Sequence, residues 1–163
     1  MSDAQLVKEF TEESSGIPCP MVPTTMNRSS VAFIIRMILS ELDELACTVT
    51  SNEEERDALL HEAMYTRDRC TTYQYANGAE LAGAQFDALV DAWYYSLNCA
   101  AKHGANLSSI FNVVHQANMA KRDPATGKFT RRSDGKVIKP VGWQSPDITG
   151  EIQRQMDEGS WST

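Results

Sequence analysis

The stretch Ser30–Cys47, SVAFIIRMILSELDELAC, joins a strongly apolar run to two glutamates near its end. Hydroxyl residues at its start, Ser29 and Ser30, are suited to cap a helix. Glu41 and Glu44 are three residues apart, so a helix carries both of them on one face. A buried carboxylate is costly unless it is paired with a positive charge or bound to a cation. The stretch therefore predicts a core helix that carries half of a functional site.

A second long helix is predicted from Ala79 to His103, where apolar residues recur at helical spacing and Gly104 follows as a stop signal. This helix carries Asp87 and Asp91 at positions i and i+4, so these two carboxylates also share one face. Both acidic pairs lie in the most apolar helices of the chain. We therefore expect the two helices to bring the four carboxylates toward a shared core.

The rest of the chain is typical of further helices joined by polar connectors. Helices are expected over residues 3–14, after Ser51 or Asn52, over Leu107–Lys121 and from Pro146-Asp147 to Glu158. Turn signals at Thr126-Gly127 and Asp134-Gly135 predict a loop or small hairpin over residues 122–140. The predicted fold class is all-α: a four- to five-helix bundle with a short C-terminal loop or hairpin and helix. The chain is expected to form a single domain over residues 1–163.

The composition is ordinary for a soluble globular protein, with 42% hydrophobic and 23% charged residues. The four cysteines lie more than 20 residues apart and include no CxxC pair, which is typical of reduced thiols in an intracellular protein. The start of the sequence, MSDAQLVKEF, lacks the apolar region of a signal peptide, and no apolar run approaches the ~20 residues of a membrane span. These features predict a cytoplasmic protein without a membrane partner.

The net charge of −7 is unevenly distributed along the chain. Residues 121–139 carry seven basic residues against two acidic ones, so the remainder is strongly acidic. A solvated basic loop is one explanation of this segment. The alternative is an anion site that faces an acidic body, which suits a phosphate-bearing small molecule together with metal ions. The overall acidity disfavours a nucleic-acid partner.

The four carboxylates indicate a site for a hard cation, because they offer oxygen ligands without an obvious histidine or cysteine partner. Mg²⁺ is the expected ion, and Mn²⁺ the expected substitute. Alternatively, the acids are exposed to solvent or pair with Arg36 and other bases. Asp43 lies off the face of Glu41 and is expected to be solvated. A di-iron bundle would need Glu-x-x-His motifs, whereas none of the three histidines lies three residues after a glutamate.

Four strings carry a resemblance that covers residues from about 30 to 150 of the chain. They are ELDEL, FDALVDAWYYSLNCAAKHG, VHQANMAK and DGKVIKPVGWQSPDI. In this order they resemble the all-α nucleoside triphosphate pyrophosphohydrolase superfamily, most closely its phosphoribosyl-ATP pyrophosphohydrolase-like or MazG-like branch. The Asn-x-x-x-Lys-like region in the third string and the GKVIKPVGWQSPDI part of the last string are the more specific, because Glu-x-x-Glu alone is common in helices.

The superfamily pattern is Glu-Glu-x-x-Glu on one helix and Glu-x-x-Asp on the next. Ser40 stands at the first position, while Glu41 and Glu44 match the other two. On the second helix Asp91 matches the aspartate and Ala88 stands in place of the glutamate, with Asp87 one residue earlier as its candidate substitute. These departures leave the number of metal ions and the level of activity open.

The resemblance implies Mg²⁺-dependent hydrolysis of a (deoxy)nucleoside triphosphate to the monophosphate and pyrophosphate. It assigns metal binding and catalysis to Glu41, Glu44, Asp87 and Asp91, and nucleotide binding to Asn118, Lys121, Lys139 and Trp143. Of these, Glu41 or Asp87 is the candidate base, and the Trp143 ring is a candidate platform for the nucleobase.

The resemblance also bears on the substrate and the assembly of the protein. A similar phage-encoded group acts on (d)GTP-type purines, which favours a dGTP-like substrate. Other family members form dimers or tetramers, which favours a homodimer or homotetramer. The alternative is a non-catalytic helical nucleotide-binding or assembly module, which the unusual Ser40 and Ala88 support.

Overall fold

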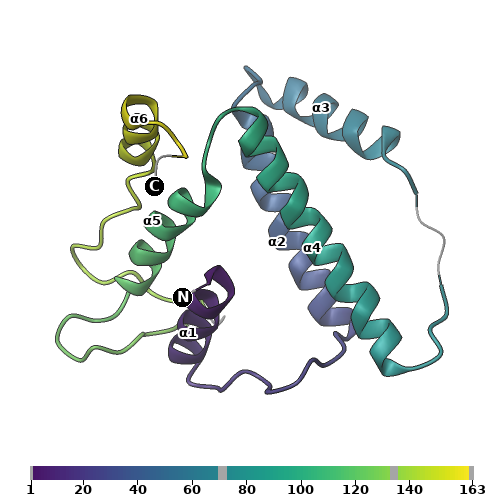
Figure 1. Cartoon of the computed structure of the whole chain (residues 1–163), viewed down its shortest axis with the longest axis horizontal. Helices are drawn as coiled ribbons and strands as arrows, with labels where there is room; N and C mark the ends of the chain where they lie inside the picture. Colours follow the sequence, from purple (N-terminus) through teal and green to yellow (C-terminus); the bar gives the residue numbers. More distant parts are fainter. Residues whose placement is uncertain (1, 70–72, 133–135, 162–163) are drawn as a thin grey trace. The chain divides into compact units, whose positions relative to one another are not determined.

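The computed structural model describes residues 2–69, 73–132 and 136–161. Within these ranges the chain forms six helices (Figure 1). Their bounds are α1 Asp3–Ser15, α2 Arg28–Cys47, α3 Glu53–Thr66, α4 Gly78–Lys102, α5 Leu107–Met119 and α6 Ile148–Glu158. The only β-pairing among the described residues is an isolated antiparallel bridge between Arg131 and Val137. The predicted all-α fold class is therefore confirmed.

Amide and carboxylate side chains set the starts of most helices. Asn27, Asn52 and Asn106 each accept a hydrogen bond from the backbone N–H three residues later, at 2.9, 3.0 and 3.3 Å. Asp147 does the same at the start of α6. These bonds satisfy N–H groups that a helix leaves without partners in its first turn. The prediction of Ser29 or Ser30 as the cap of α2 was wrong, because Asn27 occupies that position.

The chain divides into two compact units, one of Met1–Val22 with Leu89–Thr163 and one of Pro23–Ala88. The division falls inside α4, which contributes to both. The prediction of a single domain over residues 1–163 stays a prediction.

In the first unit α5 contacts both α1 and α6. The buried amide of Gln155 ties α6 to the start of α5, because its Oε1 accepts from the Asn106 N–H at 2.8 Å and its Nε2 donates to the Asn106 carbonyl at 3.2 Å.

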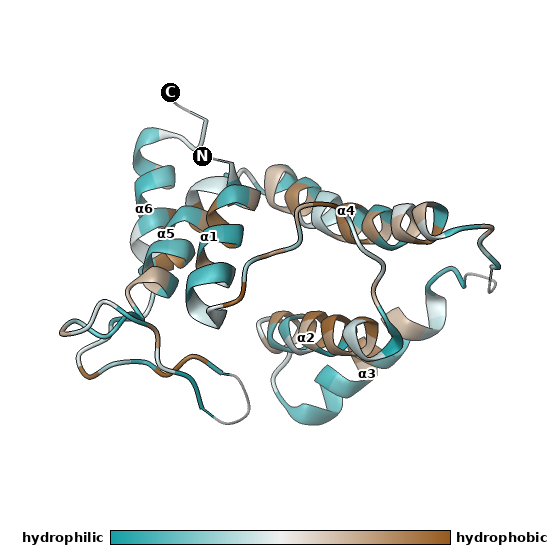
Figure 2. Ribbon diagram, turned by 90° about the horizontal axis from the view of Figure 1, so that it is seen from below, coloured by the Kyte–Doolittle hydropathy of each residue, from teal (hydrophilic) through white to brown (hydrophobic). Residues whose placement is uncertain are grey.

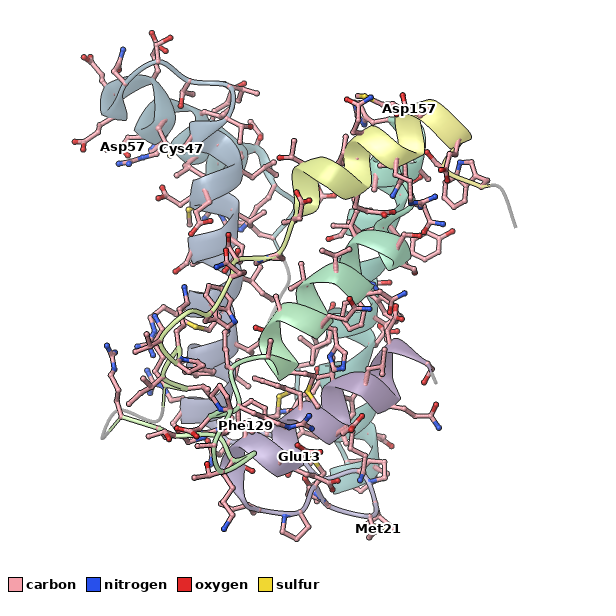
Figure 3. The ribbon with its side chains drawn as sticks, turned by 90° about the vertical axis from the view of Figure 1, so that its left-hand side faces the viewer. Glu13, Met21, Cys47, Asp57, Phe129 and Asp157 are labelled. Atoms are coloured by element: carbon pink, nitrogen blue, oxygen red, sulfur yellow. The ribbon has the colours of Figure 1, made fainter. Side chains whose placement is uncertain are left out.

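The segment that follows α5 is fastened to α1 at several points. Arg122 forms an ion pair with Glu13, and the rings of Phe10 and Phe129 meet edge to face with centroids 5.4 Å apart. Figure 3 shows the labelled Glu13 and Phe129 close together in this region. Arg131 adds a hydrogen bond to the Ser14 hydroxyl at 3.0 Å. These contacts fix one side of the basic segment.

Of the two turns predicted within residues 122–140, the structure describes one. At Thr126-Gly127 the chain turns, with Gly127 at φ 67° and its N–H donating to the Asp123 carbonyl at 2.8 Å. The second signal, Asp134-Gly135, lies outside the described residues. On either side of it the Arg132 N–H donates to the Lys136 carbonyl at 2.9 Å, as in a short hairpin.

In the second unit α2 contacts α3. The side chain of Gln85 forms two hydrogen bonds, of 2.7 and 2.8 Å, with the backbone of Met26, and so ties the connector before α2 to α4. Figure 2 shows hydrophobic ribbon along much of α2 and of α4, yet many large apolar side chains on both helices are exposed. No helix that the structure describes combines the length and the apolar content needed to cross a membrane.

Candidate functional site

The four predicted metal-binding carboxylates are all exposed on their helices. Glu41 and Glu44 lie on α2, and Asp87 and Asp91 lie on α4. Within the described part of the chain none of the four forms an ion pair or a hydrogen bond with another residue. Their negative charge is therefore not neutralised by lysine or arginine, which leaves them suited to a cation.

Asp43 behaves differently from its acidic neighbours. Its side chain is 45% exposed, in line with the predicted solvation, and its carboxylate also lies 3.3 Å from the guanidinium of Arg56 on α3. Arg36, a predicted alternative partner for the acids, instead lies over the Phe33 ring at 5.6 Å from its centroid. Neither Arg36 nor Arg56 thus pairs with Glu41 or Glu44.

Within the second unit, the described carboxylates of Glu41, Glu44 and Asp87 do not form a cluster that could hold a metal ion. In the second unit no Cα atom of α2 lies within 8 Å of a Cα atom in the part of α4 that belongs to that unit. Across residues 2–69, 73–132 and 136–161, no group of three or more His, Cys, Asp or Glu side chains could hold a metal ion. Convergence requires packing of the two helices, so the metal site stays a prediction.

The three histidines contact neighbouring rings or backbone within the chain. His115 is buried in α5 and stacks on Phe111, with ring planes 11° apart. His61 stacks on Tyr65, and His103 contacts the Cys99 carbonyl through Nδ1 at 2.8 Å. The buried His115 therefore serves packing within the first unit.

Ser40 and Ala88 stand where the superfamily pattern has acids, and both are exposed. The Ser40 hydroxyl donates to the Arg36 carbonyl one turn earlier at 3.0 Å, a bond that serves only its own helix. Both positions therefore have room for a longer side chain.

The predicted nucleotide-binding residues, in contrast, come together in the first unit. The Lys121 ammonium donates to the Asn118 side-chain oxygen at 2.6 Å. The Lys121 and Lys139 ammonium groups lie 5.5 and 4.3 Å from the centroid of the Trp143 ring. The Trp143 indole N–H donates to the Ala117 carbonyl at 2.7 Å and so joins the C-terminal segment to α5. Residues from two stretches of the chain thus form one cationic cluster around an indole.

The electrostatics of this cluster favour an anion. Partial burial, together with repulsion from Lys139 and Lys136, lowers the pKa of the Lys121 ammonium below its ordinary value. No salt bridge involves Lys121 or Lys139 within the described residues. Asp123 lines the same hollow as the two lysines but forms no ion pair with either, so their like charges still favour the binding of a polyanion.

Two hollows adjoin the cluster. One, of about 510 Å³, is lined by Lys121, Lys139 and residues of the basic segment. The other, of about 480 Å³, lies between α5 and residues 140–147 and is lined by Trp143 and Gln116 among others. Three residues, Pro124, Pro140 and Val141, line both hollows. A polyphosphate chain in the first hollow would therefore lie next to a second space of the size of a nucleoside.

Sequence reasoning missed two parts of this arrangement. Lys136 acts on the Lys121 pKa, and its spacing from Lys139 in the string KVIKP was a signal for it. The Ala117 carbonyl that fixes Trp143 has no signal, because a backbone acceptor is present at every position.

Comparison with known proteins identifies the family. No protein-family model matches the chain, and no curated protein matches it. The chain is similar to a protein from Exiguobacterium sp. 255-15 whose crystal structure is described as that of a "putative NTP pyrophosphohydrolase". The two share 30% sequence identity with a TM-score of 0.80, over 97% of this chain and 98% of that one. The fold thus defines the class, an all-α protein similar in structure to a putative NTP pyrophosphohydrolase. The chain belongs to the all-α NTP pyrophosphohydrolase superfamily.

Proposed function

We propose that the protein hydrolyses a (deoxy)nucleoside triphosphate to the monophosphate and pyrophosphate in a Mg²⁺-dependent reaction. The observation that carries this proposal is the similarity to the Exiguobacterium protein, at 30% identity over nearly the whole of both chains. The unpaired carboxylates and the unpaired lysines support it from the chemistry of the chain itself. A nucleotide substrate also fits the cytoplasmic location that the cysteine pattern predicts.

The carboxylates Glu41, Glu44, Asp87 and Asp91 would hold the metal. Their oxygen-only donor set and their lack of basic partners fit Mg²⁺, or Mn²⁺ in its place. A metal bound there supplies charge for the phosphate oxygens and lowers the pKa of the attacking water. A carboxylate not used in coordination, Glu41 or Asp87, would accept the proton of the attacking water.

The basic cluster would bind the phosphates. Lys121 and Lys139 supply two ammonium groups, and Asn118 holds the first of them in place through its 2.6 Å hydrogen bond. Phosphoryl transfer depends mainly on positioning and on charge stabilisation, so two fixed cations suit the outgoing pyrophosphate.

We further propose that the protein is a homodimer or homotetramer. Contacts between copies of the chain would complete the packing of the single domain predicted over residues 1–163. Ile35, Leu39 and Leu42 lie at positions i, i+4 and i+7 of α2 and are 52%, 45% and 45% exposed. A row of large apolar side chains left this exposed is typical of an interface. The partner we infer is a second copy of the chain, because its α4 carries the matching apolar and acidic positions.

Light scattering on the purified protein tests the assembly. We expect the mass of two or four chains for the natural protein and of one chain for Leu39→Asp. Val22→Asp, a change at an apolar connector residue that is 68% exposed, is the control and should leave the mass unchanged. A monomeric natural protein would contradict the proposal.

A purine deoxynucleotide, dGTP-like, is our proposed substrate, on the likeness to the phage group that acts on (d)GTP-type purines. The decisive assay offers each dNTP and NTP with Mg²⁺ or Mn²⁺ and measures pyrophosphate and monophosphate. We expect pyrophosphate release to be fastest with dGTP. Release of inorganic phosphate instead would place the cleavage at a different bond.

The second candidate is a non-catalytic helical nucleotide-binding or assembly module. Ser40 and Ala88 favour it, because each removes a carboxylate that the superfamily pattern contains. In that case nucleotides bind, as measured by calorimetry, but no pyrophosphate is released from any of them with either metal ion.

A further inference from the structure

The Trp143 indole contacts a backbone carbonyl through its N–H and two lysine ammonium groups through its ring. Its N–H donates to the Ala117 carbonyl at 2.7 Å, which fixes the edge of the ring to α5. The Lys139 ammonium lies 4.3 Å from the ring centroid, and the Lys121 ammonium lies 5.5 Å from it. Both distances are within the range of a cation–π interaction. The ring is thus oriented by α5 and presents its negative π-system to the lysines.

This arrangement compensates for an unfavourable approach of like charges. Lys121 and Lys139 repel each other strongly enough to contribute to the lowered pKa of Lys121. The electron-rich face of an indole attracts ammonium groups without neutralising them. The two lysines can therefore stay close together and keep their charge for a ligand.

We propose that Trp143 is a positioning residue, whose ring holds the Lys121 and Lys139 ammonium groups as a clamp for a polyphosphate chain, in place of serving as a platform for the nucleobase. The inference deepens the proposed function and rests on it for the identity of the substrate. The clamp itself requires only a chain of phosphates, which the hollow lined by both lysines has the volume to accept.

The position of Lys139 argues against base stacking on the face that it covers. A base stacks on an aromatic ring at about the distance at which this ammonium now lies, so it would have to displace the Lys139 cation.

The test compares two ligands, one with a base and one without. Calorimetry measures the binding of inorganic tripolyphosphate and of dGTP, both without divalent metal, to the natural protein and to Trp143→Leu. We expect the variant to weaken both ligands by the same factor, about tenfold, because the loss falls on the phosphates. If tripolyphosphate binds unchanged while dGTP binds more weakly, Trp143 is a base platform and the proposal is overturned.

Three further variants guard against loss of the fold, which circular dichroism monitors. Trp143→Phe keeps an aromatic face for the lysines, and we expect a smaller loss that is again equal for both ligands. A loss confined to dGTP overturns the proposal with this variant as well. Lys139→Met should weaken tripolyphosphate binding, and Lys139→Arg should restore it.

The binding test of Trp143 gives a result that is independent of the assay for the proposed hydrolysis. Absence of pyrophosphate release from every nucleotide would refute the proposed hydrolysis, whereas the equal or unequal loss of the two ligands would still decide the role of Trp143. Conversely, an active enzyme whose Trp143→Leu variant binds tripolyphosphate normally would retain the function and refute the clamp.

Discussion

The guanidinium of Arg56 lies 3.3 Å from the carboxylate of Asp43, which stands between Glu41 and Glu44 in the sequence. Three acids within four residues of α2 thus have different surroundings. Asp43 is half-buried and pairs with Arg56 of α3, whereas Glu41 and Glu44 are exposed. Pairing of Asp43 ties α2 to α3 and leaves the other two carboxylates available for a ligand.

This difference predicts opposite results for two isosteric substitutions. Glu44→Gln should lower pyrophosphate release by about 10²–10³-fold, the range typical of removing one group that stabilises the transition state electrostatically. Asp43→Asn should leave activity unchanged and lower the free energy of unfolding by less than about 1 kcal/mol, because the pair is partly exposed. Steady-state assays and urea denaturation measure the two effects. Full activity of Glu44→Gln would show that the site is misplaced.

Restoring the missing acids should strengthen metal binding. Ser40→Glu and Ala88→Glu each add a carboxylate at an exposed position that has room for it. We expect the double variant to bind Mn²⁺ more tightly than the natural protein, as measured by electron paramagnetic resonance, and EDTA to abolish pyrophosphate release from both. Ser40→Gln with Ala88→Gln is the control of equal size without charge. Equal Mn²⁺ affinity in all three proteins would contradict the assignment of these faces to the metal.

The contacts between α1 and the basic segment predict a local loss of stability. Arg122→Ala removes the ion pair with Glu13 and the cation–π contact with Phe129, in which the guanidinium lies 5.6 Å from the ring centroid. Together these should cost about 0.5–2 kcal/mol of unfolding free energy. Hydrogen exchange should increase in residues 122–132 more than in α6. Arg122→Lys keeps the charge and should lose less, whereas equal exchange in the two variants would argue against the ion pair.

The sequence predicted those features that depend on neighbouring residues. Gly104, at φ 77°, follows the end of α4 as expected of a glycine stop signal, and Asn52 caps α3. The cap of α2 was missed because three polar residues compete there. The Asn27 side chain accepts from the Ser29 and Ser30 hydroxyls at 2.6 and 3.1 Å, so the serines support the cap in place of forming it.

The basic cluster and the carboxylates also differ in how far neighbouring residues in the sequence predict them. Lys139 and Trp143 belong to one short string, and Lys121 lies one turn beyond Asn118, so local spacing relates the members of each pair, whereas the resemblance to the superfamily predicted the set as a whole. The convergence of Glu44 with Asp87 depends on how α2 packs against α4, which no local pattern encodes. The Arg122–Glu13 pair joins residues 109 positions apart and likewise has no sequence signal.

The acid stability of the first unit should depend on Glu151. Hydrogen bonds from Arg154 and Gln155 lower the pKa of this carboxyl from 4.5 to about 2. Because the folded protein holds fewer protons at Glu151 than the unfolded chain between these two values, the stabilisation is present above pH 4.5 and is lost as the pH falls toward 2. Glu151→Gln should therefore have a melting temperature that falls less steeply than that of the natural protein over this range. Glu158→Gln changes the same charge at the second, more exposed partner of Arg154 and should retain most of the natural slope. Parallel curves for the natural protein and Glu151→Gln would refute the contribution of this carboxylate to acid stability.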